Sequence, residues 1–254
     1  MVDISSLYMF ESSSANNMEN QHLWIKSASL FIGQLNKLID SQINHDFKIR
    51  NAIEFVSDYT ELGSVLTKYN SDKSDSFHNY HIFYSYVIEK LGRYSPLNVL
   101  EIGLGTNNPL IVSSMGVNGR PGASLYAFRE YMPNSKFYGA DIDKDILFES
   151  ENIKTCYVDQ LDSSTFDSLN TAFGNITYDI IIDDGLHSIG ANFNTLLFAL
   201  TKINKNGWII IEDIFHSDNW KGIDFILKSS GKYETFIMHS PTTDFCFMYA
   251  VHKL

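Results

Sequence analysis

Acidic residues follow two apolar stretches of the chain, and a histidine lies close behind the first pair. The stretch 178–182 runs into Asp-Asp-Gly-Leu-His at 183–187, and the stretch 208–211 runs into Glu212 and Asp213. If both stretches are parallel strands, their carboxyl ends meet at the edge of the sheet where α/β folds bind ligands. Neighbouring strands lie about 4.8 Å apart, so the acids can share one cation, with His187 close by as a base.

The composition bounds the class of protein. The chain has 254 residues, 44% of them hydrophobic, which is enough for one domain, or one domain with an extension. Its formal net charge of -11 argues against nucleic acid or an anionic membrane as partner, because both need basic patches. No apolar run approaches 18 residues, and the first residues lack the pattern of a signal peptide, so we expect a cytoplasmic protein. Cys156 and Cys246 lie in apolar, strand-like stretches, which favours small core residues over a disulfide or a nucleophile.

The N-terminal part differs from the rest of the chain. Residues 11–20 are polar and of low complexity, so we expect residues 1–20 to be flexible. Between residues 23 and 61, apolar residues recur at helical spacing, which predicts a helical extension over 1–65 ahead of a main domain over 66–254. We expect these helices to cover one face of the sheet, to form contacts in a homo-oligomer, or to act as a lid.

From residue 97 onward, short apolar stretches alternate with helical patterns, which is typical of right-handed βαβ units. The last two strands are joined by a connection too short for a crossover, so they must form a hairpin. The predicted fold is therefore α/β: a doubly wound, mostly parallel seven-stranded sheet with an antiparallel last strand, the layout of a class I methyltransferase. The predicted strands are 98–102, 136–140, 155–158, 178–182, 208–211, 233–238 and 245–251, and the predicted helices are 78–91, 123–131, 163–173, 190–203 and 220–229.

Three strand ends could hold a nucleotide-like cofactor. The first strand runs into a turn containing Gly103 and Gly105, but no third glycine follows to hold a pyrophosphate on a helix, which argues against a dinucleotide. The second strand ends at Asp141, which could bind ribose hydroxyls or cap the next helix. The third ends at Asp159 and Gln160, which could bind an adenine edge or likewise form a cap.

Taken in order, these motifs resemble the metal-dependent sugar O-methyltransferases of macrolide biosynthesis, mycinamicin type. The resemblance covers roughly residues 66–215, with three departures: Leu186 replaces a common serine, the loop 106–121 is unusual, and the first 60 residues match nothing known to us. The motifs that carry it are 100–103 (Leu-Glu-Ile-Gly), 122–125 (Gly-Ala-Ser-Leu), 138–141 (Tyr-Gly-Ala-Asp), Asp159-Gln160, 183–187 and Glu212-Asp213, with Asp72, Lys73, His78, Tyr80 and Tyr84 upstream.

The resemblance implies a cofactor, a metal and a base. It implies Mg²⁺ held by Asp184, Glu212 and Asp213, with His187 as the general base. Asp184 and His187 would then be the catalytic residues. It also implies S-adenosylmethionine bound by Glu101, Gly103, Gly105, Asp141, Asp159 and Gln160.

The expected activity is methyl transfer to a hydroxyl of a sugar or other polyol-like small molecule. The chemistry fits, because a hard cation lowers the pKa of a bound hydroxyl and a histidine then removes the proton. Alternatives are a catechol-type O-methyltransferase, an inactive scaffold that binds S-adenosylmethionine, and, less favoured, a nicotinamide-dependent oxidoreductase.

Several of these residues also have ordinary structural interpretations. Asp183 is expected to hydrogen-bond backbone at the strand end, and His216 to be a plain loop histidine rather than a second base. His187 could simply start a helix. Adjacent strand residues face opposite sides, so Glu212 or Asp213 could point away from the metal unless the strand end breaks the alternation. The stripe of His78, Tyr80, His81 and Tyr84 is expected to be partly core and partly pocket.

Overall fold

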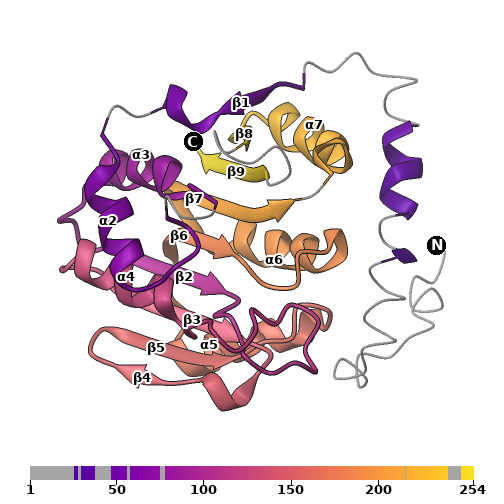
Figure 1. Cartoon of the computed structure of the whole chain (residues 1–254). Coiled ribbons are helices and arrows are strands. Elements are labelled where there is room, and N and C mark those ends of the chain that lie inside the picture. Colours follow the sequence, from indigo (N-terminus) through magenta and orange to yellow (C-terminus); the bar gives the residue numbers. More distant parts are fainter. Residues whose placement is uncertain are drawn as a thin grey trace.

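The computed structural model describes residues 26–27, 30–37, 47–55, 58–74, 78–214, 216–239 and 247–254. The strands among these residues form one nine-stranded sheet of order β1-β8-β9-β7-β6-β2-β3-β5-β4 (Figure 1). The strands are β1 (Ile49–Asn51), β2 (Asn98–Ile102), β3 (Lys136–Asp141), β4 (Glu149–Ser150), β5 (Ile153–Tyr157), β6 (Tyr178–Asp183), β7 (Ile203–Ile214), β8 (Tyr233–His239) and β9 (Phe247–Lys253). The helices are α2 (Thr60–Lys68), α3 (His81–Leu91), α4 (Ala123–Tyr131), α5 (Asp167–Phe173), α6 (Ile189–Lys202) and α7 (Lys221–Ser229).

The order of the strands reverses at β2. From β2 the chain builds outward through β3 and β5, and then returns to place β6 and β7 on the other side of β2, all in parallel. β9 then inserts between β7 and β8 and is antiparallel to both. The doubly wound sheet with an antiparallel last strand is confirmed, and its switch point places a ligand site at the carboxyl ends of β2, β3 and β6.

The prediction of seven strands was too low, because two short strands extend the edges of the sheet. β4 pairs with β5 in a tight antiparallel hairpin. β1 lies within the segment predicted to be helical and pairs in parallel with β8, where Ile49 lies opposite Ile237. An edge strand presents unpaired backbone groups, and β1 satisfies those of β8, so pairing here overrides the helical spacing.

The rest of the N-terminal extension is only partly described. Residues 30–37 are helical, as predicted. The side chain of Asn36 joins this helix to α7, since it donates to the carbonyl of Asp218 and accepts from the backbone of Gly222. The boundary expected after residue 65 falls inside α2, and the division into extension and main domain stays a prediction.

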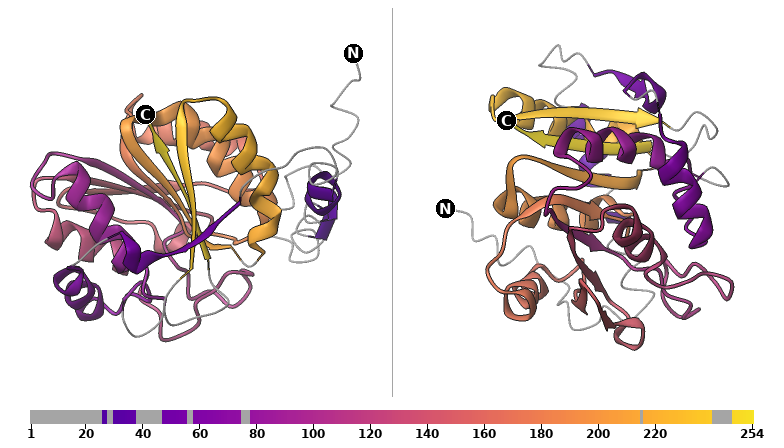
Figure 2. Two further views of the ribbon diagram at one scale, coloured as in Figure 1. Left: turned by 90° about the horizontal axis from the view of Figure 1, so that it is seen from above. Right: turned by 90° about the vertical axis from the view of Figure 1, so that its left-hand side faces the viewer.

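Two hydrophobic clusters cover the two faces of the sheet (Figure 2). α2, α3 and α4 pack on one face against side chains such as Val99 and Ile180, and α5, α6 and α7 pack on the other against Leu100 and Ile181. Neighbouring strand residues thus alternate between two buried faces, which is why the central strands read as continuous apolar runs.

Some sequence predictions fall on residues outside those described: the flexible start over 1–20, Cys246, and the connection 240–244. Cys156 is half-buried on β5, and burial raises the pKa of its thiol to about 11. It is therefore protonated near neutral pH, in agreement with the predicted core role. Within the described part of the chain, no helix is long and apolar enough to cross a membrane.

Candidate active site

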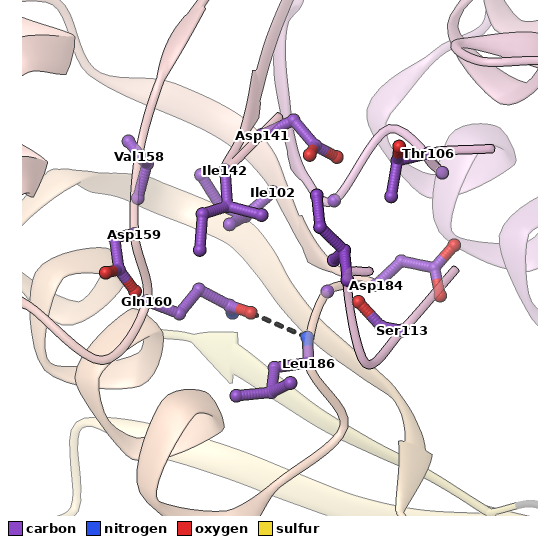
Figure 3. Close-up of a pocket in the computed structure, with 14 residues that line it drawn as sticks. Ile102, Thr106, Ser113, Asp141, Ile142, Val158, Asp159, Gln160, Asp184 and Leu186 are labelled. Carbon is purple, nitrogen blue, oxygen red and sulfur yellow. Dashed lines mark hydrogen bonds between the residues drawn. The ribbon is translucent and has the colours of Figure 1, made fainter. Parts of the chain in front are cut away.

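A pocket opens at the carboxyl ends of the central strands (Figure 3). The turn after β2, the ends of β3 and β5, and the loop after β6 form its wall, and the loop after β2 adds Ile111 and Ser113. Pockets in this position of a doubly wound sheet hold cofactors. Its lining includes five of the six residues predicted to bind a cofactor: Gly103, Gly105, Asp141, Asp159 and Gln160.

The turn after β2 requires glycine. Gly103 has a φ of +95°, and a Cβ at this position would lie 2.1 Å from the backbone oxygen of Asp184. Gly105 has a φ of +76°, also in the region that side chains disfavour. The turn after β2 therefore packs directly onto the loop after β6, and this contact closes one side of the cavity.

Asp141 ties the glycine turn to the end of β3. One of its carboxylate oxygens accepts from the backbone N–H of Leu104 at 2.7 Å, and the other from that of Asp143 at 2.8 Å. Burial raises the pKa of Asp141 above its usual range. Thr106, which the sequence analysis did not single out, lines the cavity and donates to Asp143.

Gln160 holds the loop after β6. Its amide nitrogen donates to Asp183 and Thr195, each at 2.7 Å, and its amide oxygen accepts from the backbone of Leu186 at 2.8 Å. Asp183 is fully buried and also accepts from Asn192. Asp183 is thus a structural residue bonded mainly to side chains rather than to backbone. Gln160, which lines the cavity, fixes the loop that carries Asp184 and His187.

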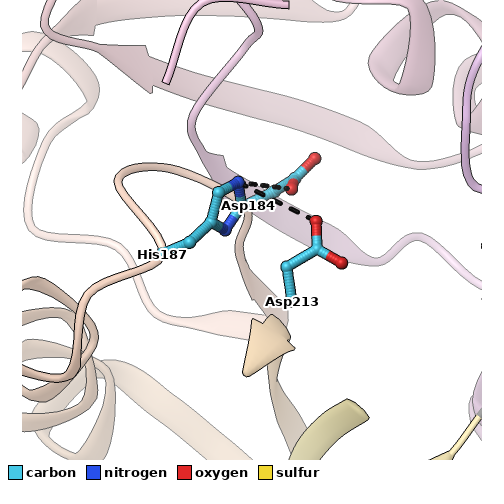
Figure 4. Close-up of side chains that lie close together, drawn as sticks. All are labelled: Asp184, His187 and Asp213. Carbon is cyan, nitrogen blue, oxygen red and sulfur yellow. Dashed lines mark ion pairs between the residues drawn. The ribbon is translucent and has the colours of Figure 1, made fainter. Parts of the chain in front are cut away.

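Two acids and a histidine meet beside the cavity (Figure 4). Ligand atoms of Asp184, His187 and Asp213 all lie within 4.8 Å of one another. His187 Nε2 is 3.8 Å from both Asp184 Oδ1 and Asp213 Oδ2. Two carboxylates with ligand oxygens this close together could hold a hard divalent cation, which prefers oxygen ligands.

The two acids at the end of β7 have different surroundings. Asp213 has a φ of +52°, and the pairing of β7 with β9 is irregular between Ile211 and Ile214. This irregularity ends the normal alternation of the strand. Asp213 accepts from Tyr80 and faces His187, whereas Glu212 accepts from Tyr84 and, at 2.7 Å, from Lys73. Of the three predicted metal ligands, Asp184 and Asp213 lie together with His187. Glu212 lies outside this cluster and is bonded to Lys73 and Tyr84.

Lys73 lies in the middle of the acids. Its side chain is 1% exposed, and its ammonium group pairs with Asp184, with Glu212, and with Glu101 at 3.5 Å. Burial acts to lower its pKa, but these carboxylates outweigh burial and hold the pKa of Lys73 well above its usual value. Only the resemblance drew attention to Lys73, because no local pattern marks a lysine that pairs with strands far along the chain.

Comparison with curated proteins finds O-methyltransferases among its matches, and no family model matches. A curated tetracenomycin-type rhamnosyl 3'-O-methyltransferase from Streptomyces olivaceus is 27% identical over 156 residues, which are 61% of this chain and 37% of that enzyme. Mycinamicin VI 2''-O-methyltransferase from Micromonospora griseorubida is 31% identical over 122 residues, 46% of this chain and 30% of that enzyme. The chain thus spans about a third of the length of these curated relatives.

A solved MycE methyltransferase of the mycinamycin pathway, in complex with Mg and SAH, matches with a TM-score of 0.59 at 20% identity, over 78% of this chain and 56% of that one. The chain has the class I methyltransferase fold. Its sequence resembles the sugar O-methyltransferases of macrolide biosynthesis, as the motifs predicted.

Within this methyltransferase fold, Glu101 does not line the cavity. It is fully buried, accepts from Ser124 Oγ at 2.5 Å, and pairs with Lys73. Burial raises the pKa of Glu101 to about 7. Glu101 is therefore enclosed by Ser124 and Lys73 and has no surface open to a ligand.

His78, His81 and His216 are not part of the close cluster. His216 is exposed at the start of a short 3-10 helix, as expected for a loop histidine. His78 Nδ1 is 3.6 Å from Asp213 Oδ1. Tyr80, His81 and Tyr84 are all buried, and Tyr80 and Tyr84 donate to Asp213 and Glu212. That part of the stripe lines a substrate pocket stays a prediction.

Proposed function

We propose that this chain is an O-methyltransferase that uses S-adenosylmethionine and Mg²⁺ to methylate a hydroxyl of a sugar or polyol-like small molecule. One observation carries the proposal: Asp184 belongs both to the lining of the cavity and to the cluster with His187 and Asp213. A methyl donor in the cavity and an activated hydroxyl at the cluster would thus be adjacent, as direct transfer requires.

The cavity fits S-adenosylmethionine by its position and by the groups that line it. Gly103 and Gly105 let the chain approach a ligand closely, because no side chain intervenes. Asp141 and Asp159 are held by backbone N–H groups at two neighbouring strand ends, where they can accept from ribose and adenine. Gln160 lines the same wall, but its amide is already bonded within the chain, so we assign it to shaping the cavity.

The acids fit Mg²⁺, which prefers oxygen ligands and retains open positions for waters or substrate. Asp184 and Asp213 would hold the cation, and Glu212 remains a third predicted ligand next to them. When bound, S-adenosylmethionine supplies the methyl group and Mg²⁺ lowers the pKa of a hydroxyl beside it.

His187 is placed to act as the general base. Its Nε2 faces the two carboxylates, whereas its Nδ1 is buried and has no hydrogen-bond partner among the described residues. The acceptor's proton would pass to Nε2 while the oxygen–methyl bond forms and the sulfur–methyl bond breaks. The products are a methyl ether and S-adenosylhomocysteine. Asp184 and Asp213 stabilise the imidazolium that results, because both carboxylates lie within 4 Å of Nε2.

The acceptor class rests on the relatives. The curated relatives are named as methyltransferases of sugars on tetracenomycin, mycinamicin and oleandolide compounds. A vicinal diol suits the site, because its hydroxyls could fill positions that Mg²⁺ leaves open, and the reacting hydroxyl would lie beside the cation. The cytoplasmic location and the homo-oligomer expected from the sequence stay predictions.

The test is transfer of radiolabelled methyl from S-adenosylmethionine to a panel of rhamnosides, other glycosides with free vicinal diols, and catechol. We expect labelled glycoside ethers that require Mg²⁺ and disappear with a chelator. Labelling of catechol alone would favour the catechol-type alternative. Binding of S-adenosylmethionine without Mg²⁺-dependent transfer to any acceptor would favour an inactive scaffold.

A further inference from the structure

The site contains a permanent cation of its own, the ammonium group of Lys73. It lies among Asp184, Glu212 and Glu101, and its side chain is 1% exposed. A buried charge is retained only where it is paired, and here three carboxylates surround one ammonium. Lys73 therefore holds these three carboxylates close together.

The two oxygens of Asp184 have different partners. Oδ2 accepts from Lys73, and Oδ1 lies 3.8 Å from His187 Nε2. Because the ammonium holds one oxygen, the carboxylate cannot rotate freely. The other oxygen is left directed toward His187 and Asp213, which together with Asp184 form the cluster suited to a divalent cation.

Lys73 is itself fixed by the backbone around it. Its carbonyl accepts from the N–H of His81, the first residue of α3, at 2.9 Å. Tyr80 and Tyr84, close along the same part of the chain, donate to Asp213 and Glu212. Residues 73–84, of which 75–77 are not described, thus supply at least one donor to each of the three strand-end acids.

We propose that Lys73 is a positioning residue that orients Asp184 and Glu212 so that the divalent cation binds at Asp184 Oδ1 and Asp213. This rests on the proposed function, because it assumes that the cluster binds a cation. Lys73 touches neither the cofactor cavity nor His187 in the contacts described. Its role is to hold ligand carboxylates, which in metal sites commonly changes affinity by 10- to 100-fold.

Positioning and simple charge repulsion predict opposite changes in cation affinity when Lys73 is removed. A positive group beside a cation site weakens binding, so removing it should tighten binding if charge alone matters. If Lys73 orients the ligands, removing it should weaken binding, because Asp184 loses the partner that directs Oδ1.

The experiment is a titration of the protein with Mn²⁺, a hard cation used as the probe for Mg²⁺. The free Mn²⁺ is measured by electron paramagnetic resonance. Wild type, Lys73→Met and the matched control Lys68→Met are compared. Lys68 is an exposed lysine that pairs with Glu130 on α4, away from the site. We expect Lys73→Met to weaken Mn²⁺ binding at least about tenfold, with Lys68→Met equal to wild type.

A second readout separates positioning from loss of structure. The affinity for S-adenosylhomocysteine, measured by calorimetry, should change less than about threefold in Lys73→Met, whereas general damage would weaken both ligands alike. Equal or tighter Mn²⁺ binding, or a parallel loss of both ligands, would overturn the proposal.

Lys73→Met leaves three acids without their shared partner and can fail to fold. The double variant Lys73→Met/Glu101→Gln removes one negative charge with the positive one, and its reference is Glu101→Gln alone. The same loss of at least about tenfold is expected between these two proteins, and equal affinity would overturn the proposal. If wild type itself binds no Mn²⁺, the cation site of the proposed function fails, and the role of Lys73 fails with it.

Discussion

His187 Nε2 lies 3.8 Å from Asp213 Oδ2, although His187 follows β6 and Asp213 lies near the end of β7. Both have a left-handed backbone, with φ values of +55° and +52°. This conformation is uncommon for residues other than glycine and concentrates at functional sites. At each position it turns a side chain toward the same point, beside the carboxylate of Asp184.

Replacing His187 with Gln tests its role as the base. We expect kcat to fall at least about 100-fold, because general base catalysis commonly contributes that much. Affinity for S-adenosylmethionine should stay close to wild type, since His187 does not line the cavity. Steady-state kinetics and calorimetry measure the two quantities. His216→Gln, at an exposed histidine, is the control and should leave both unchanged.

Gly103→Ala tests the contact between the loops after β2 and β6. The new Cβ would overlap the backbone oxygen of Asp184, and φ at this position is +95°. We expect a loss of about 3 kcal/mol in the free energy of unfolding and no measurable binding of S-adenosylmethionine. Gly174→Ala is the matched control, because φ is +83° but a Cβ meets nothing within 4 Å. Backbone strain alone should cost it about 1–3 kcal/mol and leave binding intact; loss of S-adenosylmethionine binding in both variants would contradict the packing argument.

Gln160→Ala tests the amide that fixes the loop after β6. The substitution leaves the buried carboxylate of Asp183 without one donor and the backbone N–H of Leu186 without its acceptor. Chemical denaturation should show a loss of about 2–3 kcal/mol, together with weaker binding of S-adenosylmethionine. Gln34→Ala, at an exposed position of the helix 30–37, should change neither. Unchanged stability of Gln160→Ala would mean that the loop holds its shape without the amide.

The raised pKa of Glu101 predicts that the free energy of unfolding depends on pH. Its pKa is about 7 in the folded protein, raised mainly by burial, against a usual value of 4.5. Between these pH values the folded state keeps a proton that the unfolded state releases, so the free energy of unfolding falls as pH rises, and the loss is complete above about pH 7. Glu101→Gln removes this effect, so relative to wild type it should gain about 3 kcal/mol between pH 4.5 and 7.

The control variant, Glu130→Gln, should show a pH dependence of the opposite sign. Hydrogen bonds from Lys68 and Tyr69 lower the pKa of Glu130, so Glu130→Gln should lose stability relative to wild type as pH rises above its folded pKa. Urea unfolding at each pH measures both differences. A difference between Glu101→Gln and wild type that does not change with pH would contradict the assigned pKa of Glu101.

The sequence predicted the fold and the edge of the sheet where the site lies. Continuous apolar runs such as 180–182 identify strands buried on both faces, and acids directly after them can only meet at one edge. That Glu212 and Asp213 both face the acid site could not be predicted, because strand periodicity puts neighbours on opposite faces and only the left-handed backbone of Asp213 changes that.

Contacts between distant parts of the chain were also beyond the sequence pattern. Glu101 was predicted to bind the cofactor, yet it is enclosed by Lys73 and Ser124, which come from the segment before α3 and from α4. β1 was predicted as helix, because its three residues carry no strand signal of their own and take their conformation from the edge of β8. In both cases a tertiary partner decides the outcome.

The most direct test of the account is calorimetric titration of S-adenosylmethionine, and then of Mg²⁺, into wild type, Asp213→Asn and the control Asp218→Asn. Asp213 belongs to the acid cluster but not to the cavity lining, and Asp218 is an exposed acid. The account predicts that all three proteins bind S-adenosylmethionine and that only Asp213→Asn fails to bind Mg²⁺. Absence of S-adenosylmethionine binding in wild type, or equal Mg²⁺ binding by wild type and Asp213→Asn, would contradict it.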